Sequence, residues 1–366
     1  GAAPKFPQTF SIQFLLKYYS LSTSAINLAS NAPSFGTARE AALEQALLSL
    51  DKMMEGGIYD QLGGGFARYS TDPEWLAPHF EKMLYDNALL VATLSEAYQI
   101  TKEDKYKTTI DHTLGFIERE MLDRSGGFYA ALDADSEGEE GKFYVWQKEE
   151  IQNILGIDTD VYCDYYNVSA NGNWEGKNIL RILEPLPVFA ANRQYKIEDL
   201  KALLQACNNK LLAEREKRIR PALDDKIILG WNALMNTAYS KAYAATANEA
   251  YRQRAIQNMQ FILEAFTDGE AGLKHVWKNG IAKFPAFLDD YAYLIQALLQ
   301  LHRITANNDY LIKAKAFCEK VISDFSEPDG YFYYTRAGQQ DVIVRKKEVY
   351  DGATPSGNSI MTQNLV

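Results

Sequence analysis

One arrangement of residues occurs three times along this chain with constant spacing. An apolar stretch begins in the three copies at Asn87, Asn232 and Tyr291. Eleven residues later lie Tyr98, Tyr243 and His302, and three residues after those lie Thr101, Thr246 and Thr305. The copies close at Phe128, Leu273 and Phe332, each of which follows a turn that contains glycine. A pattern that keeps its offsets over about forty residues indicates a repeat architecture.

Each copy has the pattern of a helix, a short loop, a second helix and a glycine turn with a short aromatic strand. Apolar residues recur with the period of a helix, for example at Tyr106, Ile110 and Leu114. With further helices expected near residues 10–19, 148–155 and 161–166, the chain holds about six helix pairs. We therefore predict an all-α protein with an (α/α)6 toroid, or six-hairpin barrel, whose loops carry short β-strands. An open α-solenoid is the alternative, and the long aromatic loops after every second helix favour the toroid.

The C-terminal stretch predicts the start of another repeat. Residues 351–359 have the pattern of a loop that leads into a sixth inner helix, and the chain stops at Val366. An inner helix without its outer partner leaves apolar surface uncovered. We therefore expect a single barrel domain over residues 1–366 that lacks its last helix.

Composition narrows the class of protein. The 366 residues carry a net charge of -10, which argues against nucleic acid as a partner. No apolar run reaches the roughly 18 residues of a membrane span, so we expect no membrane association. Three scattered cysteines suit a reducing compartment, and we expect a cytoplasmic protein. Aromatic residues make up 12% of the chain, enough for both a core and a ring-walled pocket.

The first candidate site lies in a glycine-rich loop and the segment after it. Residues 56–69 include Gly63, Gly64 and Gly65 in a row, which suits a tight loop with close backbone approach. Pro78 suits the first turn of a helix. On that helix His79 and Asp86 would share a face, because a spacing of seven returns to the same side. A histidine and a carboxylate facing a cavity can transfer protons, and the alternative is a capped helix with a hydrogen-bonded histidine.

An acidic loop forms the second candidate site. Residues 133–141 begin like a calcium-binding loop, but position twelve is Tyr144, where a bidentate glutamate is needed. We therefore do not expect an EF-hand, and a looser cation site is a minor alternative. Asp133 and Asp135 would bind sugar hydroxyls, cap helices or act as acids and bases. Glu139 and Glu140 have the pattern of a solvated turn.

Paired acids precede the later inner helices. They are Asp224-Asp225, Asp289-Asp290 and the single Asp351. Helix capping explains some of them. Acids at the same end of successive inner helices would also meet at one barrel mouth, and two carboxylates across a cavity are the groups that glycoside hydrolysis requires. We count Asp225 and Asp290 with His79, Asp86, Asp133 and Asp135 as the candidate catalytic residues.

Other residues of the same loops would bind the substrate. Tyr59, Trp75, Trp231 and Tyr291 would stack on sugar faces, and Arg68, Asn87, Asn232 and Asn358 would donate hydrogen bonds. Of the four histidines only His79 stands in an unusual loop, whereas His112 and His302 suit structural roles. The fingerprints of zinc, dinucleotide and serine-hydrolase sites are missing, so we expect neither a metal nor a cofactor.

Several of these motifs together resemble a known family. They are the segments 3–7 (APKFP), 63–70 (GGGFARYS), 78–87 (PHFEKMLYDN), 133–139 (DADSEGE) and 351–358 (DGATPSGN), with Asp225-Lys226 and Trp231-Asn232. The chain is similar over its whole length to the spermatogenesis-associated, thioredoxin-domain-containing proteins. One departure is Ala67, where the family tends to carry histidine, so no role of that histidine is carried over.

The resemblance implies a six-hairpin barrel related to N-acylglucosamine 2-epimerases and six-hairpin glycosidases. It also implies a thioredoxin-like domain upstream of the family's Ala-Pro-Lys-Phe-Pro junction, and because this sequence begins at that junction we expect the domain to lie outside it. The resemblance brings no established reaction, and the link to sugars rests on fold analogy.

These observations predict a carbohydrate-active enzyme, either a glycoside hydrolase or a sugar epimerase or isomerase. Acid and base groups in a central cavity would act on a sugar-like small molecule. The alternative is a non-catalytic barrel that binds a ligand or serves as a scaffold for the thioredoxin-like domain.

Overall fold

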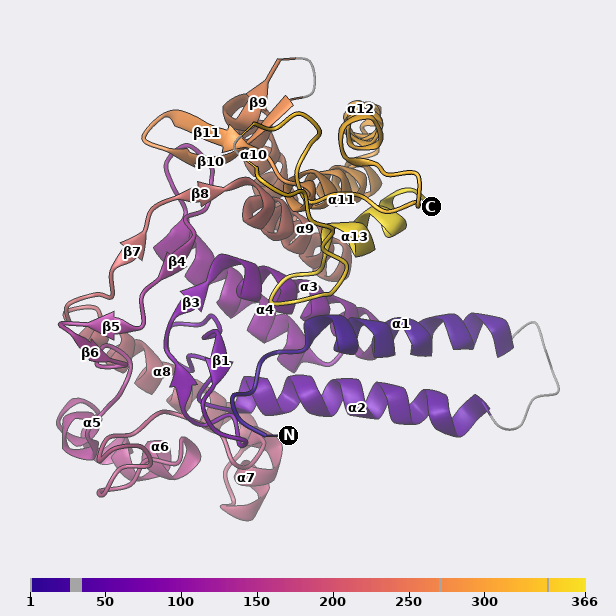
Figure 1. Cartoon of the computed structure of the whole chain (residues 1–366). Coiled ribbons are helices and arrows are strands. Elements are labelled where there is room, and N and C mark those ends of the chain that lie inside the picture. Colours follow the sequence, from indigo (N-terminus) through magenta and orange to yellow (C-terminus); the bar gives the residue numbers. More distant parts are fainter. Residues whose placement is uncertain (1, 27–34, 270–271, 341) are drawn as a thin grey trace. The chain divides into compact units, whose positions relative to one another are not determined.

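The computed structural model describes residues 2–26, 35–269, 272–340 and 342–366 (Figure 1). The chain divides into two compact units. Unit 1 comprises Gly1–Gln8, Ser34–Lys82 and Leu132–Leu223, and unit 2 comprises Thr9–Pro33, Met83–Ala131 and Asp224–Val366. The two-residue strands β3 (Lys82–Met83), β4 (Ala131–Leu132) and β7 (Leu223–Asp224) contain three of the points where the chain passes between the units. A single domain over residues 1–366 stays a prediction beside these two units.

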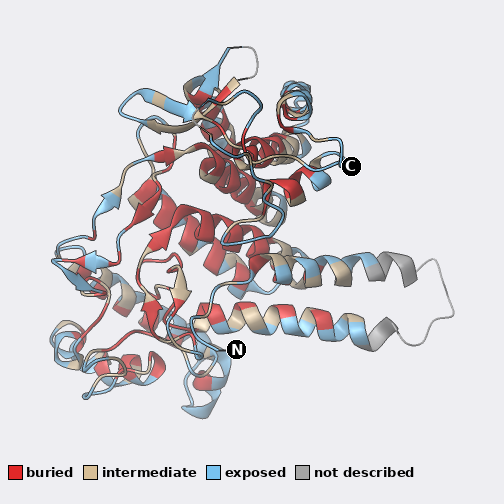
Figure 2. Cartoon of the chain, viewed as in Figure 1, coloured by how far each residue is buried: buried red, intermediate tan, exposed pale blue. Residues whose placement is uncertain are grey.

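Unit 2 contains three of the predicted helix pairs. They are α3 (Leu84–Thr101) with α4 (Asp104–Phe116), α9 (Leu229–Thr246) with α10 (Glu249–Phe266), and α11 (Leu288–Thr305) with α12 (Asn308–Phe325). A π-helical turn, Ile117–Met121, extends α4. Helix α9 packs against α3 and α11, and these three helices are buried along most of their length (Figure 2). By contrast α12 buries one stripe, Ala314, Phe317, Val321 and Phe325, at the spacing of an amphipathic helix.

The recurring threonines close the loop inside each pair. The Thr101 hydroxyl donates to the Ala97 carbonyl and accepts from the Glu103 amide, at 2.9 and 3.2 Å. Thr246 and Thr305 make the equivalent bonds at their own positions. The next residue is left-handed in each copy, and its amide bonds the carbonyl of Tyr98, Tyr243 or His302. The three copies of the repeat therefore end their inner helices with the same C-cap hydrogen bonds.

Residues at the start of the inner helices form hydrogen bonds with a strand residue from an earlier part of the chain. The Phe128 amide donates to Asn232 Oδ1 at 2.8 Å, and Asn232 Nδ2 donates to the Phe128 carbonyl at 3.0 Å. Asn358 makes the same two bonds with Phe332, at 2.9 and 3.0 Å. In the remaining copy the Leu273 amide donates to the Tyr291 hydroxyl at 3.1 Å. We call these three contacts the clasps, and they explain why both ends of the pattern recur together.

Short strands of unit 2 lie between the helix pairs. They are β8 (Ile227–Ile228), β9 (Thr267–Asp268), β10 (Gly272–Lys278) and β11 (Ile281–Pro285). Strand β10 pairs antiparallel with each of the others. The predicted aromatic strands at Phe128 and Phe332 are single bridges, to Leu122 and Ser326. Helix α1 (Thr9–Ile26) and helix α13 (Gly357–Asn364) complete the unit, and α13 is the predicted inner helix after residues 351–356.

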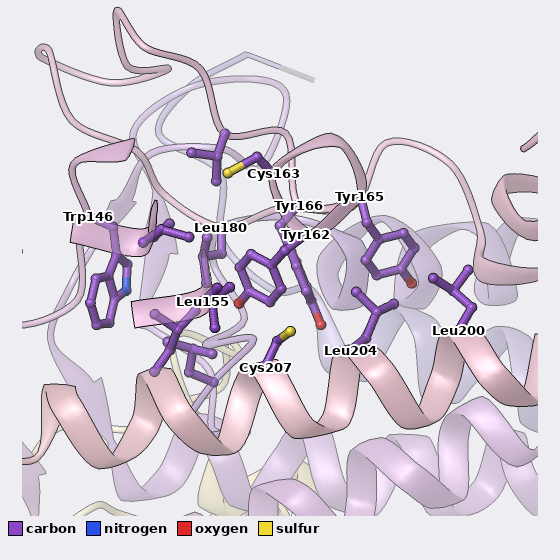
Figure 3. Packing of buried hydrophobic residues seen from close by; sticks show 14 of the residues in the cluster. Trp146, Leu155, Tyr162, Cys163, Tyr165, Tyr166, Leu180, Leu200, Leu204 and Cys207 are labelled. Carbon is purple, nitrogen blue, oxygen red and sulfur yellow. The ribbon is translucent and has the colours of Figure 1, made fainter. Parts of the chain in front are cut away.

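Unit 1 contains α2 (Phe35–Glu55), α5 (Lys148–Leu155), α6 (Thr159–Tyr165), α7 (Leu186–Asn192) and α8 (Ile197–Arg215). A 3-10 turn, Gly156–Asp158, joins α5 to α6. The core of unit 1 is aromatic. It contains Trp146, Tyr162, Tyr165 and Tyr166, which pack with Leu200 and Leu204 of α8 (Figure 3). Cys163 and Cys207 lie in the same core as free thiols, and burial raises the pKa of Cys163 to about 11. These cysteines therefore act as small core residues.

The predicted helix through Pro78, His79 and Asp86 is wrong. Residues Pro78–His79 form strand β2, which pairs with β1 (Tyr69–Ser70), and helix α3 begins only at Leu84. A proline disfavours the helical conformation of the residue before it, and the backbone of this segment bonds the 68–71 segment. His79 therefore lies in unit 1 and Asp86 in unit 2, and the two do not share a helix face.

The length and polarity of a helix determine whether it could cross a membrane. Among the described residues, no helix combines the length and apolar character that crossing a bilayer requires.

Candidate functional site

Two consecutive aspartates lie in the first turn of α11. Asp290 occupies the third helical position, and its Oδ2 accepts the amide of Phe287 before the helix, at 2.9 Å. Its Oδ1 accepts the amide of Gly230, in the first turn of α9, at 2.9 Å. A Cβ at Gly230 would lie 3.0 Å from that oxygen, so glycine allows the close approach. The side chain of Asp290 is only 4% exposed and is fixed by these donors.

His275 of β10 completes this site with a contact that the sequence analysis missed. Its Nδ1 lies 2.8 Å from Asp290 Oδ2, and its ring meets the Phe287 ring at 4.8 Å between centroids. Burial acts to lower the pKa of His275, but the hydrogen bond and the charge of Asp290 outweigh burial and raise it. The positive imidazolium is therefore stabilised next to the carboxylate.

The other aspartate of the doublet, Asp289, has a raised pKa. Burial and the adjacent charge of Asp290 raise the pKa of Asp289 to about 7, although the Gly357 amide donates to Oδ1 at 2.8 Å and opposes the shift. A Cβ at Gly357 would lie 2.5 Å from Asp289 Oδ1, so this contact also depends on glycine. Asp289 is half-buried, which leaves part of its carboxyl accessible.

Together Asp289, Asp290 and His275 form what we call the α11 site. It combines a carboxyl group that is partly protonated near pH 7 with a buried carboxylate–imidazole pair. A carboxyl group with a pKa of about 7 beside an imidazole brings an acid and a base together in one site. The α11 site can therefore donate one proton and accept another near neutral pH.

The sequence pointed to only part of the α11 site. The doublet before Tyr291 was visible, and Asp290 was chosen from it. His275 carries no signal, because the other copies of the repeat have Ala130 and Tyr334 at the equivalent place. Its contact with Asp290 depends on how β10 lies against the start of α11, which no spacing predicts.

In unit 1, His79 contacts a glutamate that was predicted to be a solvated turn. Its Nδ1 lies 2.7 Å from Glu140 Oε1, and its ring stacks on Tyr69 with 5.0 Å between centroids. Glu140 belongs to β6 (Glu139–Glu140), which forms a hairpin with β5 (Asp135–Ser136). This hairpin is the acidic loop, and both Asp133 and Asp135 are exposed on it. Asp133 Oδ1 accepts the Asp135 amide at 3.2 Å, as in an ordinary turn.

The glycine-rich loop wraps a buried ion pair. Arg215 at the end of α8 makes two bonds to Asp60, of 2.8 and 2.9 Å, and Lys82 Nζ lies 2.8 Å from Asp60. Burial acts to raise the pKa of Asp60, but Arg215 and Lys82 hold it well below its usual range. A Cβ at Gly63 would lie 2.1 Å from Arg215 Nη2. The loop thus approaches an arginine of its own chain.

The remaining predicted residues lie as follows. Tyr59 and Trp75 are buried, Tyr59 against Phe66 and Trp75 beneath Lys5. Arg68 pairs with Glu81 at 3.2 Å. Asp86 and Asn87 are buried in the first turn of α3, and Trp231 of α9 meets Tyr85 edge-on at 4.9 Å. Asp225 pairs with Lys278. The clasps are formed by Asn232, Tyr291 and Asn358, so the polar side-chain groups of these residues are hydrogen-bonded to backbone groups of the protein.

Comparison with known proteins gives homologues of the whole chain. No family model matches. An uncharacterized protein of Caenorhabditis elegans, B0495.5, is 34% identical over all of this chain and 53% of its own length. Spermatogenesis-associated protein 20 of Mus musculus is 31% identical over all of this chain and 49% of its own length. The chain thus spans about half the length of the curated relatives it matches.

Solved structures share the fold at low identity. A family 76 glycoside hydrolase from a bovine Bacteroides thetaiotaomicron strain matches 98% of this chain and 54% of its own, with a TM-score of 0.55 and 12% identity. An inactive α-1,6-mannanase of Salegentibacter, with two consecutive aspartates replaced, matches 98% of this chain and 75% of its own. Its TM-score is 0.51 and its identity 11%. These likenesses confirm the predicted (α/α)6 fold class.

Proposed function

We propose that this homologue of spermatogenesis-associated protein 20, which has the fold of carbohydrate-active enzymes, processes a sugar-like substrate by acid–base chemistry at the α11 site. The observation that supports the proposal most is Asp289, a half-buried carboxyl group with a pKa of about 7 beside the Asp290–His275 pair. Of the catalytic residues expected from the sequence, the proposal keeps Asp290 and adds Asp289 and His275.

In a hydrolysis, protonated Asp289 gives its proton to the glycosidic oxygen as the bond to the anomeric carbon breaks. A base takes a proton from the attacking water, whose oxygen bonds to that carbon. His275, held by Asp290 through Nδ1, is the candidate base through Nε2 in its neutral form, which the raised pKa makes available as pH rises. The mannanase variant without two consecutive aspartates is inactive, and Asp289 and Asp290 are also consecutive.

In an epimerisation the same groups would act on a carbon atom instead. A base removes the proton next to a carbonyl group, and an acid returns a proton to the opposite face. The two reactions leave different isotopic marks. Hydrolysis introduces oxygen from water into the product, and epimerisation introduces hydrogen from water at carbon.

The experiment is to incubate the full-length protein with mannosides, glucosides and free hexoses in heavy-oxygen water and in deuterium oxide. We expect labelled product from one class of sugar, and a loss of roughly 100-fold or more in Asp289→Asn, the size typical of a lost general acid. Asp309→Asn is the matched control, because Asp309 also lies in the first turn of a helix but is exposed. Equal activity in Asp289→Asn and the control would refute the α11 site.

A second candidate function is a ligand-binding or scaffolding barrel that serves a thioredoxin-like domain. It is favoured by the clasps, in which Asn232, Tyr291 and Asn358 hold backbone groups. Under this alternative the full-length protein binds sugars without converting them, or binds none. A cytoplasmic location, which the scattered free cysteines favour, belongs to both candidates.

A further inference from the structure

A groove on unit 2, lined in part by Tyr291 of α11, has the size of a ligand site. Its volume is about 540 Å³, within the range of pockets that hold small molecules. We call it the β10–α12 groove. Its lining includes Leu273 and Lys274 of β10, Tyr291 of α11, Lys320 and Ser323 of α12, and Arg336.

The apolar part of the groove is rigid. Leu273, Ala286 and Tyr291 are buried, and the Leu273 amide donates to the Tyr291 hydroxyl at 3.1 Å. The Tyr291 ring packs on Phe325 of α12 at 5.4 Å between centroids. One clasp of the repeat thus forms the wall of this groove.

Most charges along the groove are already paired. Lys274 lies 2.7 Å from Asp268, and Lys320 lies 3.0 Å from Asp324. Glu319 has Lys315 at 3.8 Å. Among the described residues that line the groove, Arg336 is the charged one without an ion pair or a hydrogen bond from its guanidinium group.

The backbone on both sides of Arg336 is fixed. Arg345 donates two hydrogen bonds to the Thr335 carbonyl, of 3.0 and 2.8 Å. The Ala337 amide donates to the Asp324 carbonyl, at the end of α12, at 2.8 Å. Although its side chain is exposed, Arg336 is therefore attached to the groove at a defined point.

We propose that the β10–α12 groove binds a small organic anion, with its carboxylate or phosphate on Arg336 and its apolar face against Leu273, Ala286 and Tyr291. A guanidinium group presents parallel N–H donors that match carboxylate and phosphate oxygens. Ser323 also lines the groove, and its hydroxyl supplies a further donor. Asp289, Asp290 and His275 do not line the groove, so this site does not depend on the proposed reaction.

The test is calorimetric titration of the protein with glucose 6-phosphate, glucuronate and inorganic phosphate, with glucose as the neutral probe. We expect glucose 6-phosphate or glucuronate to bind, and Arg336→Gln to weaken binding roughly tenfold or more, because a hydrogen-bonded charge is lost. Added salt should also weaken the binding of the organic anions, because it screens their attraction to Arg336. Binding of the phosphate ester alone or of the sugar acid alone identifies the anionic group.

Arg124→Gln is the matched control, since Arg124 is an exposed arginine of unit 2 that does not line the groove. Asp289→Asn should leave anion binding unchanged, which separates this proposal from the one on the α11 site. If no probe binds, if inorganic phosphate binds as tightly as the organic anions, or if Arg336→Gln binds like Arg124→Gln, the proposal is wrong.

Discussion

Asp289 and Asp290 are neighbours in sequence, yet their surroundings give them opposite roles. Asp290 accepts two backbone amides and faces His275, which together stabilise its charge. Burial and the adjacent charge of Asp290 raise the pKa of Asp289 to about 7, against its one amide donor, Gly357. At the scale of single residues, burial beside a neighbouring charge makes Asp289 the candidate acid.

Gly63 offers a test of the buried ion pair in unit 1. In Gly63→Ala the new Cβ would lie 2.1 Å from Arg215 Nη2 and 2.9 Å from Asp60 Oδ2. We expect a loss of about 3 kcal/mol or more in the free energy of unfolding, the cost of breaking a buried pair. Chemical denaturation measures it.

Gly115→Ala is the control for this substitution. Gly115 is exposed inside α4 with nothing near its Cβ position, so alanine should stabilise by about 0.5–1 kcal/mol. Equal effects of the two substitutions would contradict the role given to Gly63.

The sequence singled out His79 as a candidate residue but gave no sign of His275. His79 was visible because its loop is unusual, but strand pairing placed it against Glu140 rather than on a helix with Asp86. His275 was invisible because its partner lies fifteen residues away, across a loop between β11 and α11. A contact between a strand and a helix start depends on strand register and loop path, which residue types alone do not determine.

At the scale of elements, the repeat is a set of hydrogen bonds more than a set of apolar positions. The threonines close the loops within helix pairs, and the clasps hold the strand residues. These roles follow from side-chain types at fixed offsets, so the helix pairs could be predicted. The segment 78–83 broke the prediction because its backbone bonds the neighbouring 68–71 segment.

Among the clasp residues, Asn232 is the one whose replacement should reduce stability most clearly. It is fully buried and holds both backbone groups of Phe128. In Asn232→Ala these groups lose their partners inside the protein, and we expect a loss of about 2–4 kcal/mol in the free energy of unfolding. Thermal or chemical unfolding measures it.

Asn308→Ala serves as the control, because Asn308 is exposed at the start of α12. It should change stability by less than about 0.5 kcal/mol. A loss in Asn232→Ala no larger than that would show that the clasp does not stabilise unit 2.

At the scale of the whole molecule, the fold class followed from the repeat, and the family followed from long motifs. The reaction did not follow from either, because many functions share one fold. Asp289 combines a pKa of about 7 with a place beside the Asp290–His275 pair. That is why the account rests on Asp289 rather than on the aromatic residues, most of which are core.

The pH dependence of kcat/KM tests the central claim most directly. Asp289 must carry its proton to act as the acid, and with a pKa of about 7 it loses that proton as pH rises. We predict that kcat/KM of the full-length protein on its sugar substrate falls above about pH 7, and that Asp289→Asn is slow and lacks this fall. A fall at the same pH in Asp289→Asn, or undiminished activity in that variant, would contradict the account.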